Sequence, residues 1–275
     1  MTRNNPYFDV LNDKIAEIVE ANGDKLIVRD PLQDQEKQNQ QIMDMIEEGI
    51  EILFLNPVDR NAVQPALEAC KKAGVKIINV DTQVKDKEYV LSAIETDHYQ
   101  AGKECAIDMM KRLKSGKIII LDNPIQQSIC QRVEGFLDTI KGNDCYKIVR
   151  IEHGEGEIEV SAKIVRNLLK ERVEFDVVFG GNDPTALGAL AAIQQEGIEK
   201  PILIYGIDGS PDVKAMIEIG YMTGTSSQSP KTIGKIAAEV AYKTLAGETV
   251  SPYIKLPSKI ITRENLSNYD RDGWQ

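Results

Sequence analysis

The chain has 275 residues, of which 42% are apolar, and its 33 basic and 43 acidic side chains give a net charge of −10. This length allows one large or two medium domains, and the acidic balance argues against general binding of nucleic acid or anionic membranes. No apolar run approaches the roughly 20 residues of a membrane span, and no signal peptide pattern begins at Met1.

Short β-branched runs alternate with amphipathic helical patterns along almost the whole chain. The predicted strands are Lys25–Val28, Ile50–Leu55, Val75–Val80, Tyr89–Glu95, Lys117–Leu121, Tyr146–Ile151, Val177–Phe179, Ile202–Gly206, Met222–Ser227 and Ile254–Ile261. The predicted helices are Gln35–Glu48, Ala62–Ala73, His98–Leu113, Gln131–Ile140, Glu159–Lys170, Pro184–Glu196, Asp212–Ile219 and Pro230–Ala246. This alternation predicts α/β architecture, with parallel sheets covered by helices on both faces.

Both halves of the chain repeat the same strand–helix rhythm, which predicts two similar lobes. The first boundary is expected near Thr96-Asp97, where a strand ends and a helix opens without a tight turn. The last helix and strand either belong to the second lobe or return to the first, and the pattern leaves both arrangements open.

Patterns typical of enzymes and metal sites are missing from the sequence. His98 and His153 have no further ligand at metal-binding spacing, and the four cysteines form no CxxC pair. No P-loop, nucleophile elbow or dinucleotide fingerprint occurs. Gly180-Gly181-Asn182-Asp183 imitates a phosphate loop, but the Asp183 carboxylate opposes an anion there. We predict no catalytic residue, cofactor or metal.

Polar side chains instead follow the predicted strands, at the sheet edge where α/β proteins bind ligands. Carboxylates, amides and arginine all hydrogen-bond hydroxyl groups, and aromatic rings cover the apolar face of a sugar. The candidates are Asp81, Arg132, Asn182, Asp208 and Gln228, together with Asn5, Tyr7 and Phe8 at a helix start.

A series of short motifs runs in order along essentially the whole chain. The motifs are Asn4-Asn5-Pro6-Tyr7-Phe8, Asn56-Pro57, Asn79-Val80-Asp81-Thr82-Gln83, Gln131-Arg132-Val133-Glu134-Gly135-Phe136, Gly181-Asn182-Asp183, Ala186-Leu187-Gly188-Ala189-Leu190, Gly206-Ile207-Asp208-Gly209-Ser210-Pro211-Asp212, and Gln228 before Ile233-Gly234. Together they resemble the ribose/galactose-type periplasmic substrate-binding proteins of sugar ABC transporters. That type I periplasmic binding protein fold is shared with the effector-binding core of lactose-repressor-type regulators.

The resemblance implies two doubly wound parallel-sheet lobes joined by a three-strand hinge, with the ligand cleft between them. The lobes would be residues 1–96 with 229–256, and residues 97–228 with 257–275, with crossings near Thr96-Asp97, Gln228-Ser229 and Leu256-Pro257. Ligand contacts implied from the first lobe are Asn5, Tyr7, Phe8 and Asp81; those from the second are Arg132, Asn182 and Asp208, with Gln228 at a hinge crossing.

Several of these residues have a structural alternative. Asn182 and Asp208 could cap the helices that follow them, and Asp183 is expected to be the cap of its helix. We expect one ring of Tyr7 and Phe8 to stack on ligand and the other to pack. Arg132 could be a surface helix residue, and the Gln228 assignment rests almost wholly on the resemblance.

Three departures from the family pattern affect the prediction. The family usually opens with a strand before the Asn-Pro-aromatic loop, and this chain starts at that loop, so the first strand of the first lobe is expected to be absent. Thr82 stands where ribose binders carry a second arginine, which argues against ribose. The segment His153–Glu157 offers glycine and acid where an aromatic often stacks, which favours a neutral or cationic ligand over an acidic sugar.

The predicted function is capture of a monosaccharide or related polyol by hinge closure and its delivery to an ABC transporter permease. The predicted location is the periplasm or, as a lipoprotein, the cell surface. A monomer is expected, with self-association as an alternative because of the missing strand. The functional alternatives are the effector domain of a regulator without its DNA-binding domain, and a sugar-modifying enzyme, which the lack of a catalytic base and metal disfavours.

Overall fold

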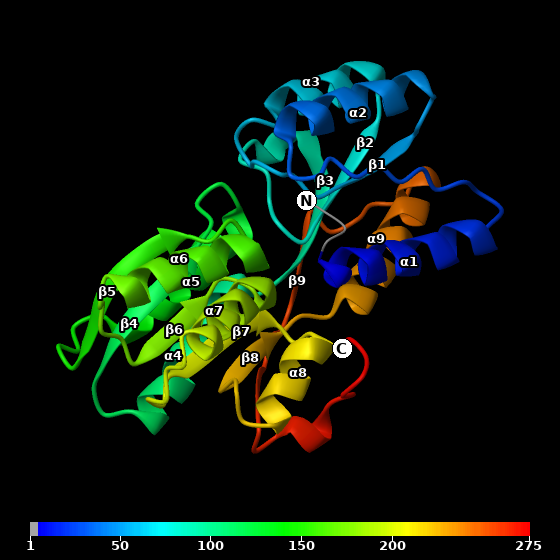
Figure 1. Ribbon diagram of the computed structural model, residues 1–275. Helices are drawn as coiled ribbons and strands as arrows, with labels where there is room; N and C mark the ends of the chain where they lie inside the picture. The colour runs from blue at the N-terminus through cyan, green and yellow to red at the C-terminus, as the bar shows by residue number, and fades with distance from the viewer. Residues whose placement is uncertain (1–4) are drawn as a thin grey trace. The chain divides into compact units, whose positions relative to one another are not determined.

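The computed structural model describes residues 5–275, which divide into two compact units (Figure 1). The first unit comprises the residues up to Thr96 together with Ile125–Ser128 and Ser229–Leu256. The second comprises Asp97–Pro124, Ile129–Gln228 and Pro257–Gln275. The chain therefore passes between the units several times, and each unit is assembled from segments that are distant in sequence.

The first unit contains a four-stranded parallel sheet in the order β1-β2-β3-β9. Its strands are β1 (Ile52–Leu55), β2 (Lys76–Val80), β3 (Val90–Thr96) and β9 (Tyr253–Leu256). Its helices are α1 (Pro6–Ala21), α2 (Gln35–Glu47), α3 (Gln64–Ala73) and α9 (Pro230–Leu245), with a 3-10 turn η1 (Lys87–Tyr89). Figure 1 shows α1 and α9 side by side along one face of this sheet and α2 and α3 along the other.

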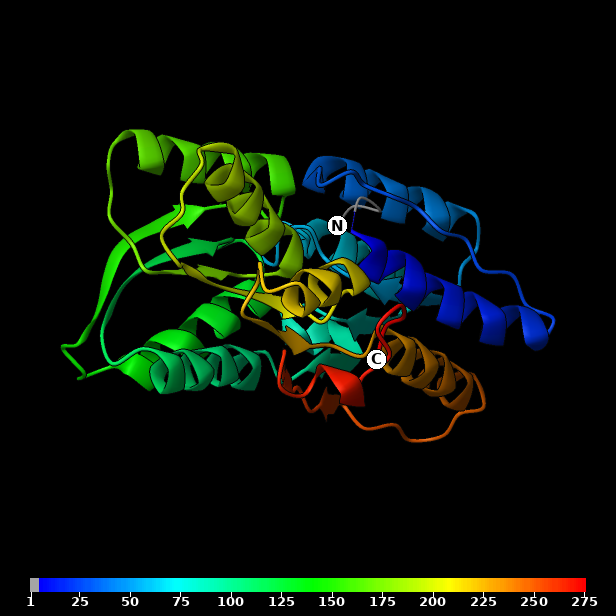
Figure 2. The same ribbon diagram turned by 60° about the horizontal axis from the view of Figure 1, so that its bottom comes forward.

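The second unit contains a six-stranded sheet in the order β10-β8-β7-β6-β4-β5. Its strands are β4 (Gly116–Asp122), β5 (Tyr146–His153), β6 (Val177–Gly180), β7 (Leu203–Asp208), β8 (Gly224–Ser227) and β10 (Ile260–Thr262). Its helices are α4 (His98–Arg112), α5 (Gln127–Ile140), α6 (Ile158–Lys170), α7 (Asp183–Gln195) and α8 (Pro211–Glu218), with a 3-10 turn η2 (Leu266–Asn268). The first two residues of α5, Gln127 and Ser128, are counted with the first unit. All strand pairs are parallel except β10 with β8, and Figure 2 shows helices on both sides of the sheet.

The strand β4 illustrates why this sheet is covered on both faces. Ile118 and Ile120 point into the apolar cluster beneath α4 and α5, where the rings of Phe136 and Phe179 stack with centroids 4.4 Å apart. Ile119 and Leu121 alternate with them and enter the cluster beneath α6 and α7. Because side chains of a strand alternate between faces, a run of apolar residues is what a doubly covered strand requires.

The prediction of parallel sheets covered on both faces is confirmed, but two predicted strands were wrong. Lys25–Val28 is not a strand, because none of the described strands lies beside it to complete a ladder. The single strand Ile254–Ile261 is two strands, β9 in one sheet and β10 in the other. Pro257 lies between them, and proline has no N–H to donate to a ladder.

Candidate functional site

In the second unit, three predicted residues form a buried chain of contacts at the carboxyl ends of the strands. Asp208 is the last residue of β7, Gln228 directly follows β8, and Arg132 lies on α5. Gln228 Nε2 donates a hydrogen bond of 2.7 Å to Asp208 Oδ1, and Arg132 Nη1 lies 3.7 Å from the same oxygen. The guanidinium and the carboxylate are each only 3% exposed. This arrangement places charged and amide hydrogen-bonding groups together at one sheet edge.

Two further contacts hold the Arg132 guanidinium in place. Its Nη1 donates to the carbonyl oxygen of Gly181 at 2.8 Å, and its Nε donates to His98 Nδ1 at 3.2 Å. His98 must therefore carry its own proton on Nε2 when it is neutral. Arg132 is thus a buried residue with fixed partners, and the alternative that it is a surface helix residue is wrong.

Asn182 and Asp183, at the start of α7, have different structural roles. Asn182 is the N-cap: its Oδ1 accepts from the backbone N–H of Thr185 at 2.9 Å, and its Nδ2 donates to the Gly156 carbonyl at 3.2 Å. The expectation that Asp183 caps this helix was wrong. Asp183 is instead the first helical residue.

Asp183 connects the start of α7 to the N-cap of α8 and to strand β8. It accepts a hydrogen bond from the Ser210 N–H at 2.8 Å and from Thr225 Oγ1 at 2.6 Å. Burial raises the pKa of its carboxyl group. Ser210, and not Asp208, caps α8, so the capping alternative fails for Asp208. The Oδ1 atom of Asp208 contacts Arg132 and Gln228, and its Oδ2 accepts a hydrogen bond of 3.4 Å from the Asp183 backbone N–H.

In the first unit, Asp81 occupies an unusual backbone conformation directly after β2. Its φ is 66°, a left-handed value that few residues with a side chain adopt, aspartate and asparagine being the usual exceptions. Asn56, which follows β1, donates from Nδ2 to Asp81 Oδ2 at 3.3 Å. Asn79 shapes the turn: its Nδ2 donates to the Thr82 carbonyl at 2.8 Å, and its Oδ1 accepts from the Val84 N–H at 3.0 Å.

The remaining predicted residues lie at the start of α1. Asn5 is the N-cap, with its Oδ1 accepting from the Tyr7 N–H at 3.0 Å. The rings of Tyr7 and Phe8 meet edge to face with centroids 5.1 Å apart. Tyr7 is buried in the core of the first unit, whereas Phe8 is half-buried. Asn4, the first residue of this motif, lies outside the described residues.

Sequence reasoning missed an aspartate–histidine pair at the same edge of the second unit. Asp122 ends β4 and His153 ends β5, and Asp122 Oδ1 lies 2.5 Å from His153 Nδ1. The hydrogen bond to the Asp122 carboxylate raises the pKa of His153. Asp122 follows a buried strand just as Asp208 does, so its position was a usable signal. His98 was missed because its role depends on a contact with a distant helix.

Within residues 5–275, no group of three or more His, Cys, Asp or Glu side chains is arranged to hold a metal ion. No described helix combines the length and apolar character needed to cross a membrane. The polar groups at the two sheet edges are hydrogen-bonding groups held by fixed neighbours. Fold and residues together define a two-unit α/β binding protein for a small polar ligand.

The comparisons with known proteins agree with this class. A family model described as "Periplasmic binding protein domain" matches residues 1–249. The ribose import binding protein RbsB of Bacillus subtilis is 30% identical over 265 residues, which cover 96% of this chain and 85% of that protein. A solute-binding protein of Mycobacterium smegmatis with bound glycerol superposes with a TM-score of 0.91 at 26% identity, covering 97% and 93% of the two chains. One from Actinobacillus succinogenes with bound D-allose has a TM-score of 0.87 at 25% identity and covers 96% of each chain.

The chain belongs to the periplasmic binding protein family. It is a solute-binding protein of the ribose-binding type that serves ABC import, and it is not an enzyme. The relatives are transport proteins, so the regulator alternative is not favoured.

Proposed function

We propose that the protein binds a monosaccharide or related polyol through both units, closing on it and delivering it to an ABC transporter permease. We also infer that it acts in the periplasm or at the cell surface. The observation that carries the proposal is the buried contact chain of Arg132, Asp208 and Gln228 at the carboxyl ends of the strands. A site of this kind would hold a ligand by hydrogen bonds to its hydroxyl groups.

The chemistry of the side chains in each unit suggests which contact each residue makes with the ligand. Asp208 accepts hydrogen bonds from sugar hydroxyls, while Arg132 and Asn182 donate from the same unit. Asp81 offers a carboxylate from the first unit, next to Asn56. At the start of α1, Asn5 would add an amide and Phe8 an aromatic ring to the ligand contacts. Tyr7 and Gln228 are the remaining two residues proposed to line the ligand site.

A neutral ligand fits these groups best. The buried guanidinium of Arg132 is balanced by the Asp208 carboxylate, so the second unit has no unpaired positive charge at this edge to attract an acidic sugar. Asp81 adds a negative charge from the first unit. The ligands of the structural relatives, D-allose and glycerol, have the same neutral, hydroxyl-rich character.

Isothermal titration with a panel of aldoses, ketoses and polyols tests the proposal. One member of the panel should bind, and a ligand at 100 times its Kd should raise the free energy of unfolding by about 2.7 kcal/mol. A smaller radius of gyration in X-ray scattering should accompany binding, because closure makes the molecule more compact. No binding by any member at millimolar concentration would refute the proposal.

Asp208→Asn tests the site itself. It keeps the shape of the side chain but removes the charge that pairs with Arg132, so it should weaken binding at least tenfold. Asp144→Asn is the matched control, because Asp144 is exposed in the turn before β5, at the amino end of the strands. Equal affinities of the two variants would reject the role of Asp208 while leaving sugar binding by the protein intact.

A further inference from the structure

The three nitrogens of the Arg132 guanidinium differ in their partners. Nη1 donates to the Gly181 carbonyl at 2.8 Å and lies 3.7 Å from Asp208 Oδ1. Nε donates to His98 Nδ1 at 3.2 Å. Within residues 5–275, the third nitrogen, Nη2, has no hydrogen-bond partner. Nη2 is therefore the nitrogen that is left for a ligand.

These partners determine which ligand groups the guanidinium can bind. Arginine binds a carboxylate or phosphate in a bidentate way when two neighbouring nitrogens donate in parallel, either Nε with Nη2 or Nη1 with Nη2. Here His98 takes the single hydrogen of Nε, and the Gly181 carbonyl engages Nη1. Each pair therefore has one nitrogen already occupied. The remaining nitrogen suits a single acceptor, such as a hydroxyl or ring oxygen of a neutral sugar.

The two edges of the guanidinium differ in what an anion would meet there. The Asp208 carboxylate lies on the Nη1 side and would repel a second negative charge. On the Nε side the neighbour is the imidazole of His98, which is fully buried. Because its Nδ1 accepts a hydrogen bond, this imidazole is neutral in the contact. His98 therefore covers the edge at which an anionic ligand could bind.

Close packing of α4 against α5 brings His98 within reach of Arg132. A Cβ on Gly102, one turn after His98 in α4, would collide with the carbonyl of Arg132. A Cβ on Gly135, three residues after Arg132 in α5, would collide with the carbonyl of Tyr99. Each helix thus has a glycine where the backbone of the other approaches. The contact between the imidazole and the guanidinium is built into the crossing of the two helices.

We propose that His98 is a positioning residue that sets the class of ligand. By accepting the Nε–H of Arg132, it holds the guanidinium in one orientation and leaves Nη2 alone to meet a ligand oxygen. The site then takes neutral sugars and polyols and rejects sugar acids and sugar phosphates. This inference rests on the proposed sugar-binding function and adds to it the residue that decides between neutral and anionic ligands.

Formate is the probe, because it is the smallest carboxylate that can accept from two guanidinium nitrogens. Isothermal titration of the full chain measures the Kd of a sugar from the panel in sodium formate and in sodium chloride, each at about 0.1 M to equalise the ionic strength. For the wild type the two Kd values should agree. His98→Ala frees the edge formed by Nε and Nη2. In chloride it should bind the sugar at least tenfold more weakly than the wild type, and formate should weaken its binding at least threefold further.

His98→Asn is the conservative variant, because its side-chain oxygen can replace Nδ1 as the acceptor. It should restore sugar binding to near the wild-type Kd and show no formate response. The Nε–H resonance of Arg132 in NMR spectra should move in His98→Ala and stay near its wild-type position in His98→Asn. Should His98→Ala fail to fold, a tenfold weaker affinity of His98→Asn or a displaced resonance in that variant would still overturn the proposal.

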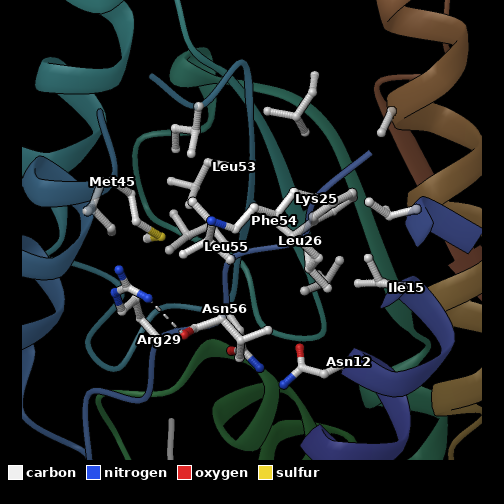
Figure 3. Close-up of a pocket in the computed structure, with 18 of the residues that line it drawn as sticks. Asn12, Ile15, Lys25, Leu26, Arg29, Met45, Leu53, Phe54, Leu55 and Asn56 are labelled. Carbon is white, nitrogen blue, oxygen red and sulfur yellow. Dashed lines mark hydrogen bonds between the residues drawn. The ribbon is translucent and has the colours of Figure 1, made fainter. Parts of the chain in front are cut away.

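Two control variants separate this effect from a general loss of stability and from anion binding elsewhere. Tyr205→Phe removes the hydrogen bond of 2.7 Å from the buried Tyr205 to Asp108, which also lies on α4. It should lower the urea midpoint without changing the sugar Kd. Figure 3 shows Arg29 beside the cavity next to β1, and its Nη2 lies 2.7 Å from Glu48 Oε1. Arg29→Gln, added to His98→Ala, should leave the formate response unchanged, and its disappearance would overturn the proposal.

The outcomes also distinguish this inference from the proposed function. If no sugar of the panel binds the wild type, both are overturned. If sugar binds but formate displaces it from the wild type, sugar binding stands and the role of His98 is overturned. The same holds if His98→Ala keeps the wild-type Kd and ignores formate, or if Tyr205→Phe loses as much affinity as His98→Ala.

Discussion

The buried Arg132–Asp208 pair should be strongly coupled, and a double-mutant cycle of Arg132→Met, Asp208→Asn and the double variant measures this. At the observed 3.7 Å, two unit charges attract each other by about 4.5 kcal/mol at an effective dielectric constant of 20. Loss of one partner from a buried pair typically costs about 3–5 kcal/mol, because the other charge remains buried. The double variant should therefore be more stable than the sum of the single effects predicts, by about 2 kcal/mol.

Urea unfolding followed by tryptophan fluorescence is the assay, since Trp274 is the only tryptophan and is buried in the second unit. The amine of Lys214 donates to the Gly273 carbonyl at 2.5 Å and anchors this segment. The exposed pair Lys117–Glu174 is the control cycle in the same unit. Its atoms are closer, at 2.6 Å, yet solvent screening should make its coupling much smaller. A coupling for Arg132–Asp208 no larger than the control would refute the reasoning.

Three more predictions concern burial, packing and protonation. Burial raises the pKa of Glu95 from 4.5 to about 7, so its contribution to stability is full below pH 4.5 and is lost as the pH rises through 7. In urea titrations, the free energy of unfolding of Glu95→Gln should rise relative to that of the wild type by up to about 3 kcal/mol between pH 4 and pH 8. If the unfolding free energies of the two proteins changed with pH in parallel, this prediction would be contradicted. Gly188→Ala should lower the Tm, because its Cβ would collide with the Ile158 carbonyl and cost about 1–3 kcal/mol; an unchanged Tm would show that α6 and α7 can separate freely. Asp122→Asn should lower the pKa of His153 in an NMR titration, and an unchanged value would exclude their hydrogen bond as its cause.

The residues that follow strands were predictable because strand order decides where they meet. Asp208 and Gln228 are 20 residues apart, yet β7 and β8 are neighbours in register, and their ends place the two side chains in contact. Burial of Arg132 was not predictable from the sequence. It depends on a helix position facing Gly181 and His98, which only tertiary packing defines.

Residue preferences for helix caps and strands gave wrong predictions where an interaction with a residue distant in sequence decided the structure. Asp183 is a good capping residue by type, but Ser210 and Thr225 hold its carboxylate elsewhere. Lys25–Val28 has a strand-like composition, but a strand exists only where a neighbour pairs with it. The pattern of residues 254–261 is continuous across Pro257, and the change of sheet there is a property of the topology.

The interleaved composition of the two units has a consequence for folding during synthesis. The first unit lacks β9 until residue 256 has been made, and the second lacks β10 until residue 262. Neither sheet can therefore be completed while the chain is still growing through its middle. Folding depends on late, long-range pairing, which is slow compared with local structure formation. We expect a nascent chain of this protein to expose unpaired strand edges until translation is almost finished, when chaperone binding would matter most.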